Sequence, residues 1–179
     1  PPLLARGGFA WGKTLAGTPA EHENPWLLLQ RPLPQPAAGP PAVPVVVDAN
    51  TATYSLHLGL GDSLAVEDES GRTVNLTVAG LLRNSIFQGD LLMSEENFLK
   101  LFPQSGGYRF FLVEADPAHV AAVQVALEAS LGDFGFDAEL TRQRLEGFLA
   151  VQNTYLLTFQ SLGGLGLAQR RRGGRRKRR

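Results

Sequence analysis

The chain contains no cysteine, and this absence excludes several classes of protein. A disulfide-stapled scaffold, a thiolate metal cluster and a cysteine nucleophile all need that side chain. Histidine is nearly as scarce, and His22, His57 and His119 lie far apart in the sequence. A metal centre built from several histidines is therefore not expected. The composition leaves the redox compartment undetermined.

Long hydrophobic runs are also missing. The longest one, residues 155–168, is interrupted by polar side chains and glycines, and it is shorter than the ~20 predominantly apolar residues that cross a bilayer. We therefore expect the chain as written to be soluble. Because it starts at Pro1 and shows no signal peptide, we also expect it to be a piece of a longer protein.

A net charge is absent as well, but the cancellation conceals a strong asymmetry. The 17 basic residues balance the 17 acidic ones, yet eight of the basic residues lie within positions 170–179. Residues 1–169 therefore hold nine basic residues against 17 acidic ones, which is a formal charge of −8. An acidic body offers no basic face to a phosphate backbone, so no nucleic-acid partner is expected. At 44% hydrophobic residues, the body can bury a core.

Period-two alternation and β-branched runs predict strands in the middle of the chain. The expected strands cover residues 43–47, 54–60, 63–67, 72–82 and 91–93. The acidic turn that ends at Gly71 joins two of them into a β-hairpin. Ser94 is placed to cap a helix over residues 95–102, and Pro103 stops it.

The last third predicts an alternation of strands and helices. Strands are expected at 108–114 and 134–140, a helix at 117–131, and a long helix that Thr141 begins and that runs to residue 159. The chain is therefore predicted to be α+β, with a small β-hairpin lobe and a β-α-β-α lobe that ends in a long helix. The predicted parts are an irregular, proline-rich segment (1–44), a β-rich lobe with a short helix (45–107), the β-α-β-α lobe (108–167) and a disordered basic tail (168–179).

Signals for chemistry are weak. Residues 7–14 fit the phosphate-loop pattern GxxxxGK[ST]. That loop needs a helix directly after it, and Gly17 and Pro19 break any helix there, so we interpret the match as chance. The carboxylates at 67–69 lie in a predicted turn without the ligand spacing of an EF-hand. We assign no catalytic, cofactor-binding or metal-ligating residue, and we expect no enzymatic activity and no cofactor.

A family resemblance covers residues 45–167. A predicted strand leads into the turn Gly61-Asp62. The short sequence string at 78–81 ends a predicted hairpin, and the string at 91–94 precedes a short predicted helix. In these strings and in the order of its elements, the chain resembles the extracytoplasmic, MacB-like periplasmic core domain of FtsX/MacB-type ABC transporter permeases. The resemblance implies a ferredoxin-like second lobe, with residues 141–159 as a stalk helix and 152–167 leading into the membrane. The chain departs from the family after Leu167, where it continues into the basic tail.

The resemblance also implies a function and partners. The domain would belong to an integral protein of the cell membrane and couple ATP-driven motion to a partner or an exported substrate. The ATP-binding subunit of the transporter would act through the missing membrane part, and a periplasmic protein or lipoprotein would bind the domain outside. The alternative is a free-standing, soluble, non-catalytic binding module.

Ile86, Phe87 and Gln88 are the candidate partner-contact residues. They lie between two predicted strands, where a loop would ordinarily be polar. Two interpretations are open: the apolar side chains fill the core from the loop, or they project as an aromatic anchor for a partner.

Overall fold

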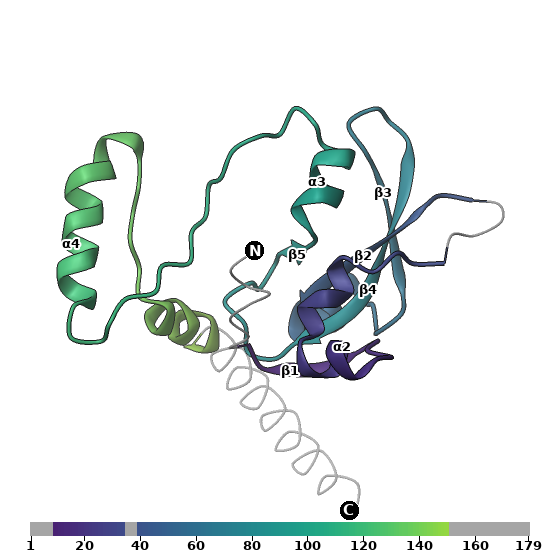
Figure 1. Ribbon diagram of the computed structural model, residues 1–179, viewed down its shortest axis with the longest axis horizontal. Coiled ribbons are helices and arrows are strands. Elements are labelled where there is room, and N and C mark those ends of the chain that lie inside the picture. The colour runs from purple at the N-terminus through teal and green to yellow at the C-terminus, as the bar shows by residue number, and fades with distance from the viewer. Residues whose placement is uncertain (1–8, 35–38, 151–179) are drawn as a thin grey trace, which may run out of the picture. The chain divides into compact units, whose positions relative to one another are not determined.

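The computed structural model describes residues 9–34 and 39–150 (Figure 1). The chain divides into two compact units, Pro1–Glu114 and Ala115–Arg179. The first contains a mixed β-sheet with short helices, which confirms the predicted α+β class. None of the helices in the described ranges combines the length and the apolar character that crossing a bilayer requires.

The sheet of the first unit is organised around its longest strand. Its members are β1 (Trp11–Thr14), β2 (Ala42–Asp48), β3 (Ser63–Glu67), β4 (Thr73–Leu82) and β5 (Leu91–Leu92). β2 runs parallel to β4 and carries β5 on its other side. β3 and β1 both pair with β4 in antiparallel fashion, β3 along residues 73–77 and β1 along residues 80–82. β4 therefore contacts three of the other four strands.

The predicted hairpin of β3 and β4 is confirmed. Its turn is closed by the carboxylate of Asp68, which accepts hydrogen bonds from the backbone N–H of Ser70 and of Arg72, both at 2.9 Å. Gly71 adopts φ 76°, a left-handed conformation that a side chain would disfavour. The local turn chemistry thus sets the register of the hairpin.

The core lies on the apolar faces of β2 and β4. Alternate residues of β4 are buried, as the period-two pattern predicted, and Val45 and Val47 of β2 are fully covered. The helix α3 (Glu95–Leu101) adds Leu101 to this cluster. Its predicted cap is confirmed, because the N–H of Asn97 donates to Ser94 Oγ at 3.2 Å.

Two sequence predictions for the part of the first unit that precedes β3 are wrong. Residues 1–44 were expected to be irregular, with Phe9 and Trp11 as a candidate for a short strand, but they contain β1, the helix α2 (Pro19–Glu23) and the 3₁₀-helix η1 (Pro25–Leu29). β1 is ordered by pairing with β4, a distant segment that local patterning does not reveal. The strand expected at 54–60 is replaced by the π-helix η2 (Thr51–Leu56), which ends at His57 with φ 54°.

The predicted strands at 108–114 and 134–140 are not formed either. A β-rich sequence becomes a strand only where a neighbouring strand pairs with it, and no ladder includes these residues in the part of the chain that the structure describes. The second unit contains α4 (Val120–Leu131) and the 3₁₀-helix η3 (Gly132–Phe134). Residues 141–150 are also helical. The predicted β-α-β-α lobe therefore lacks both of its strands.

The boundaries of the helices in the second unit also differ from the prediction. α4 begins three positions later than the expected residue 117, because the side chain of Asp116 accepts from the N–H of Ala118 at 2.8 Å and forms a turn first. The end of the predicted stalk helix beyond residue 150, the membrane-leading segment 152–167 and the basic tail 168–179 lie outside the described residues.

Candidate functional site: an aromatic cluster and its pocket

The predicted contact residues lie in the loop between β4 and β5. Ile86 is 5% exposed and Phe87 is 7% exposed, while Gln88 is half-buried. The two apolar side chains therefore point into the molecule. This placement favours the core interpretation, because a buried ring is not available as a surface anchor.

A buried polar clamp holds this loop in place. Asp48, the last residue of β2, is completely buried, and one of its oxygens accepts from the N–H of Ser85 at 2.9 Å. Its other oxygen accepts from the N–H of Asn50 at 3.0 Å. Ser85 Oγ then accepts from the N–H of Phe87 at 3.0 Å, which fixes the position from which the ring enters the core. Sequence reasoning missed Asp48 because a single acidic residue after a strand carries no local signal of burial.

Phe87 belongs to a row of five aromatic side chains, which we call the aromatic cluster. Its members are Phe9, Trp11, Trp26, Phe87 and Phe110. The ring of Phe9 stacks on Phe87 with 5.6 Å between centroids and meets Trp26 edge-on at 5.3 Å. Trp11 in turn contacts Trp26 at 5.0 Å. Contacts of this geometry stabilise beyond the area they bury, so the cluster ties the N-terminal segment to the loop.

The backbone of β4 is shaped to receive one member of the cluster. The ring of Trp11 lies against Gly80, and a Cβ at that position would stand 2.8 Å from Trp11 Cζ3. Such a distance is too short for two carbon atoms. Gly80 therefore leaves room for the indole of Trp11 against the sheet, and this indole meets that of Trp26, which is 2% exposed, at an interplanar angle of 71°.

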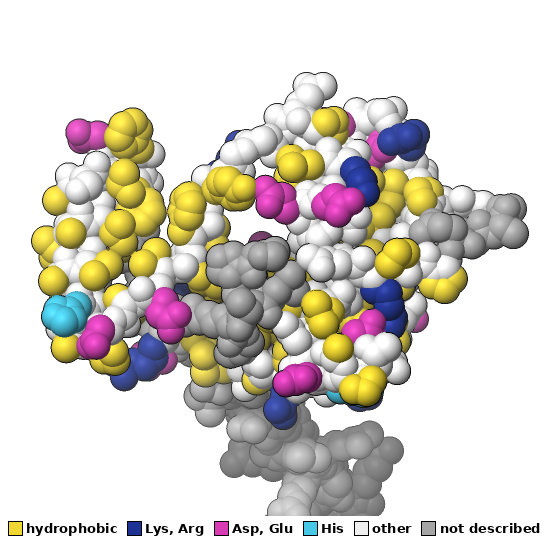
Figure 2. All heavy atoms as spheres, viewed as in Figure 1, with side chains coloured by type: hydrophobic (Ala, Val, Ile, Leu, Met, Phe, Trp, Pro, Cys, Tyr) yellow, Lys and Arg dark blue, Asp and Glu magenta, His cyan; other side chains and the backbone are white. Residues whose placement is uncertain are grey.

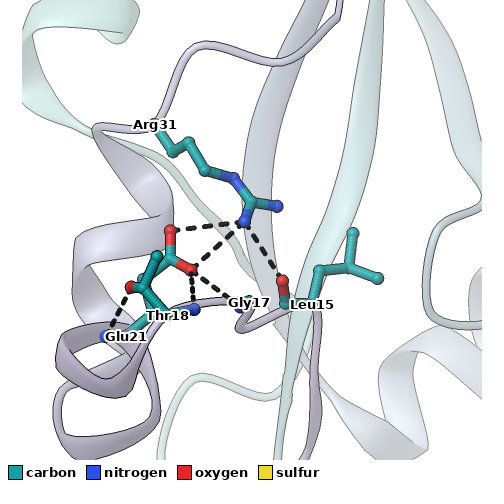
Figure 3. Close-up of polar contacts among 5 residues, drawn as sticks. All are labelled: Leu15, Gly17, Thr18, Glu21 and Arg31. Carbon is teal, nitrogen blue, oxygen red and sulfur yellow. Dashed lines mark hydrogen bonds and ion pairs between the residues drawn. The ribbon is translucent and has the colours of Figure 1, made fainter.

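Glu21 holds the segment that carries Trp26 (Figure 3). Thr18 and Glu21 form a capping box at the start of α2. The Glu21 carboxylate accepts from the N–H of Gly17 at 2.8 Å and of Thr18 at 3.1 Å. It also accepts from Arg31 Nη1 at 3.3 Å, and the same nitrogen donates to the carbonyl of Leu15 at 3.2 Å. The carboxylate and Arg31 together thus connect the segments that directly follow β1 and η1 with the start of α2.

These contacts lower the pKa of Glu21. The hydrogen bond from Gly17 is the main cause that lowers the pKa of Glu21, and the bond from Thr18 and the positive charge of Arg31 act in the same direction. Burial opposes them. Because the folded-state pKa lies below that of the unfolded chain, the ionised carboxylate stabilises the fold at neutral pH. This stabilisation is complete above about pH 4.3, the ordinary pKa of Glu in an unfolded chain. It is lost as the pH falls from there through the lower pKa of the folded state.

We expect Glu21→Gln to lower the melting temperature at pH 7 and to reduce the loss of stability on acidification. The amide keeps the shape of the carboxylate but cannot gain a proton over this range. Thermal unfolding of both proteins between pH 7 and pH 3 measures the difference. Glu23→Gln, an exposed neighbour on α2, is the control and should retain the wild-type pH dependence. An unchanged acid dependence in Glu21→Gln would show that the carboxylate has no such role.

A pocket opens beside the aromatic cluster. It has a volume of about 270 Å³ and lies among β1, α2 and η1. Phe9, Trp11 and Trp26 supply its aromatic lining, and Lys13, Thr14, His22 and Glu23 are among its polar lining residues. The lining therefore combines flat apolar surfaces with charges of both signs, which suits the binding of a small group that has an apolar and a polar part.

The other sequence signals take structural roles. Residues 12–14 of the phosphate-loop match lie in β1, where Lys13 and Thr14 pair with β4, so a phosphate-binding loop followed directly by a helix is not formed there. Asp68 is used by the hairpin turn, and the carboxylate of Glu69 accepts from the N–H of Gln104 at 2.9 Å. Within the described ranges, no three His, Asp or Glu side chains are grouped to hold a metal ion.

Comparison of the chain with protein-family models, with curated proteins and with solved structures finds no match.

Proposed function

We propose that the chain is the extracytoplasmic domain of an FtsX/MacB-type ABC transporter permease, and that it acts by binding and relaying motion rather than by catalysis. The order of the elements in the sheet unit supports this: a parallel strand, a hairpin with the Gly61-Asp62 turn before it, a short strand and a capped helix. The proposal rests on that sequence resemblance together with one structural observation on the second unit.

The observation is that residues 115–150 contain no buried side chain. The helix α4 is largely apolar, and Val125 is 66% exposed. Phe134, just beyond it, is 86% exposed. Figure 2 shows hydrophobic side chains along the visible surface of α4. A helix that is apolar on most of its circumference ordinarily packs against other protein or lies near lipid. A domain that works as one part of a membrane assembly would leave such a surface for its neighbours.

The test is to clone the complete open reading frame with its neighbouring genes, and to purify the tagged protein from membranes. We expect hydrophobic spans in the reading frame and co-purification of an ATP-binding subunit. Val125→Asp should reduce recovery of an extracytoplasmic partner, because it places a charge on the exposed apolar helix, whereas Thr53→Asp on the sheet unit should not. A reading frame without spans and without an associated ATPase would contradict the proposal.

The second candidate function is a free-standing, non-catalytic binding module. The pocket beside the aromatic cluster favours it, because a cavity lined by aromatic and polar residues can serve a soluble binder without any membrane part. Recovery of the native protein in the soluble fraction, with no ATP-binding subunit attached, would support this alternative.

A further inference from the structure

The strand β3 pairs with β4 along only one of its two edges. At the two ends of this ladder, the N–H of Val78 donates to the carbonyl of Asp62 and the N–H of Asp68 donates to the carbonyl of Arg72, both at 2.9 Å. In an antiparallel pair, the residues that exchange such bonds alternate with residues whose backbone groups point the other way. The even-numbered residues of β3 therefore face β4, and the odd-numbered residues face away from it.

The outward edge of β3 consists of Ser63, Ala65 and Glu67. All three residues are exposed, and within the described ranges their backbone N–H and C=O groups have no hydrogen-bond partner. Natural sheets usually protect such an edge with a lysine, a proline or a bulge. β3 contains neither of these residue types, and its register with β4 is unbroken. The edge is therefore open to pairing with another strand.

The sequence of β3 is complementary to itself when two copies run antiparallel about a two-fold axis that passes beside Ala65, normal to the sheet. Ser63 then stands opposite Glu67 of the second copy, so that a hydroxyl group meets a carboxylate and no like charges face each other within the strand. On the opposite face, Leu64 stands opposite Val66 of the second copy. Both side chains are half-buried in the single chain, and Val66 packs against the core. Pairing therefore continues the apolar layer of one sheet into the other.

We propose that the chain forms a two-fold symmetric dimer, in which the outer edges of two β3 strands pair and join the two sheets into one. Each outward N–H of the edge then meets an outward C=O of the second copy, so all of these open groups are satisfied. The ladder ends where the chain turns, because Asp62 accepts from the N–H of Gly59 and Asp68 from the N–H of Ser70. A strand of five residues gives a small interface, so the dimer is weak and depends on concentration. This inference rests on neither of the functions proposed above.

Sedimentation equilibrium of the full chain, up to a concentration of about 1 mM, tests the dimer and its register. We expect a monomer–dimer equilibrium for the wild type. Ala65→Lys and Ala65→Glu each place two like charges opposite each other at the axis, so each alone should weaken the dimer several-fold. An equimolar mixture of the two variants should restore it, because opposite charges then face each other. Thr53→Lys, at an exposed position of η2, is the control and should keep the wild-type equilibrium.

Ala65→Pro tests the backbone pairing itself. Proline removes the outward N–H but no hydrogen bond to β4, and an edge strand tolerates it at such a position. We expect the dissociation constant of the dimer to rise about tenfold or more, while the far-ultraviolet circular dichroism stays that of the wild type. If this variant does not fold, the two charge variants still decide the question. The proposal is overturned if the wild type stays monomeric throughout, if Ala65→Lys leaves the dimer intact, or if the mixture of charge variants does not restore it.

Discussion

Phe87→Ala is expected to lower the free energy of unfolding by about 3–5 kcal/mol, the usual cost of removing a buried aromatic ring. Phe87 is 7% exposed and sits between Phe9 and Phe110 in the aromatic cluster. Its removal leaves a cavity and also separates the loop from the N-terminal segment. Urea unfolding followed by tryptophan emission measures the loss, because both tryptophans belong to this cluster.

Phe111→Ala is the matched control, since its ring belongs to the same unit but is 56% exposed. Substitutions at exposed positions usually change stability by less than ~0.5 kcal/mol. Equal unfolding curves for Phe87→Ala and the wild type would contradict the core interpretation. If binding to a partner then weakened, the aromatic-anchor interpretation of Ile86, Phe87 and Gln88 would be restored.

Asp48→Ala is the second change with a large expected effect. It removes the acceptor of the N–H of Ser85, a buried residue of the loop, and an unsatisfied buried donor costs about 1–3 kcal/mol. The acceptor of the Asn50 N–H, at the start of the helical segment before η2, is lost as well. We therefore expect a marked fall in stability and faster hydrogen exchange at the amide of Ser85.

Asp48→Asn should recover part of the loss, because its amide oxygen can still accept one of the two bonds. Asp62→Ala is the control. Asp62 accepts from the N–H of Gly59 at 2.7 Å, but this bond is exposed to water, so its removal leaves no buried donor unsatisfied. Similar unfolding free energies for Asp48→Ala and Asp62→Ala would show that the burial of the Asp48 hydrogen bonds contributes nothing to stability.

Features that depend on neighbouring residues were predictable from the sequence. The hairpin followed from alternation on both sides of a turn that contains Asp68 and Gly71, and the cap of α3 followed from Ser94. In both cases the hydrogen bonds join residues two to four positions apart. A pattern of residue types is enough to specify such short-range contacts.

Features that depend on distant segments were not predictable in this way. Residues 108–114 have the composition of a strand, but composition cannot supply a pairing partner, and the structure leaves them irregular. β1 shows the converse case, in which a short segment with little pattern is ordered because β4 pairs with it. The candidate site belongs to the same class, since the apposition of Phe9, Trp26 and Phe87 brings together three separate parts of the chain.

The position of β4 in the sheet has a consequence for biosynthesis. The chain leaves the ribosome from its N-terminus, so β1, β2 and β3 are made before the strand with which all three pair. Until Leu82 has emerged, the apolar β2 has an unsatisfied edge and no sheet can form on either side of it. Sheets that depend on such late, long-range pairing fold slowly and pass through states prone to aggregate. The nascent chain is therefore expected to need shielding by a chaperone until β4 is complete.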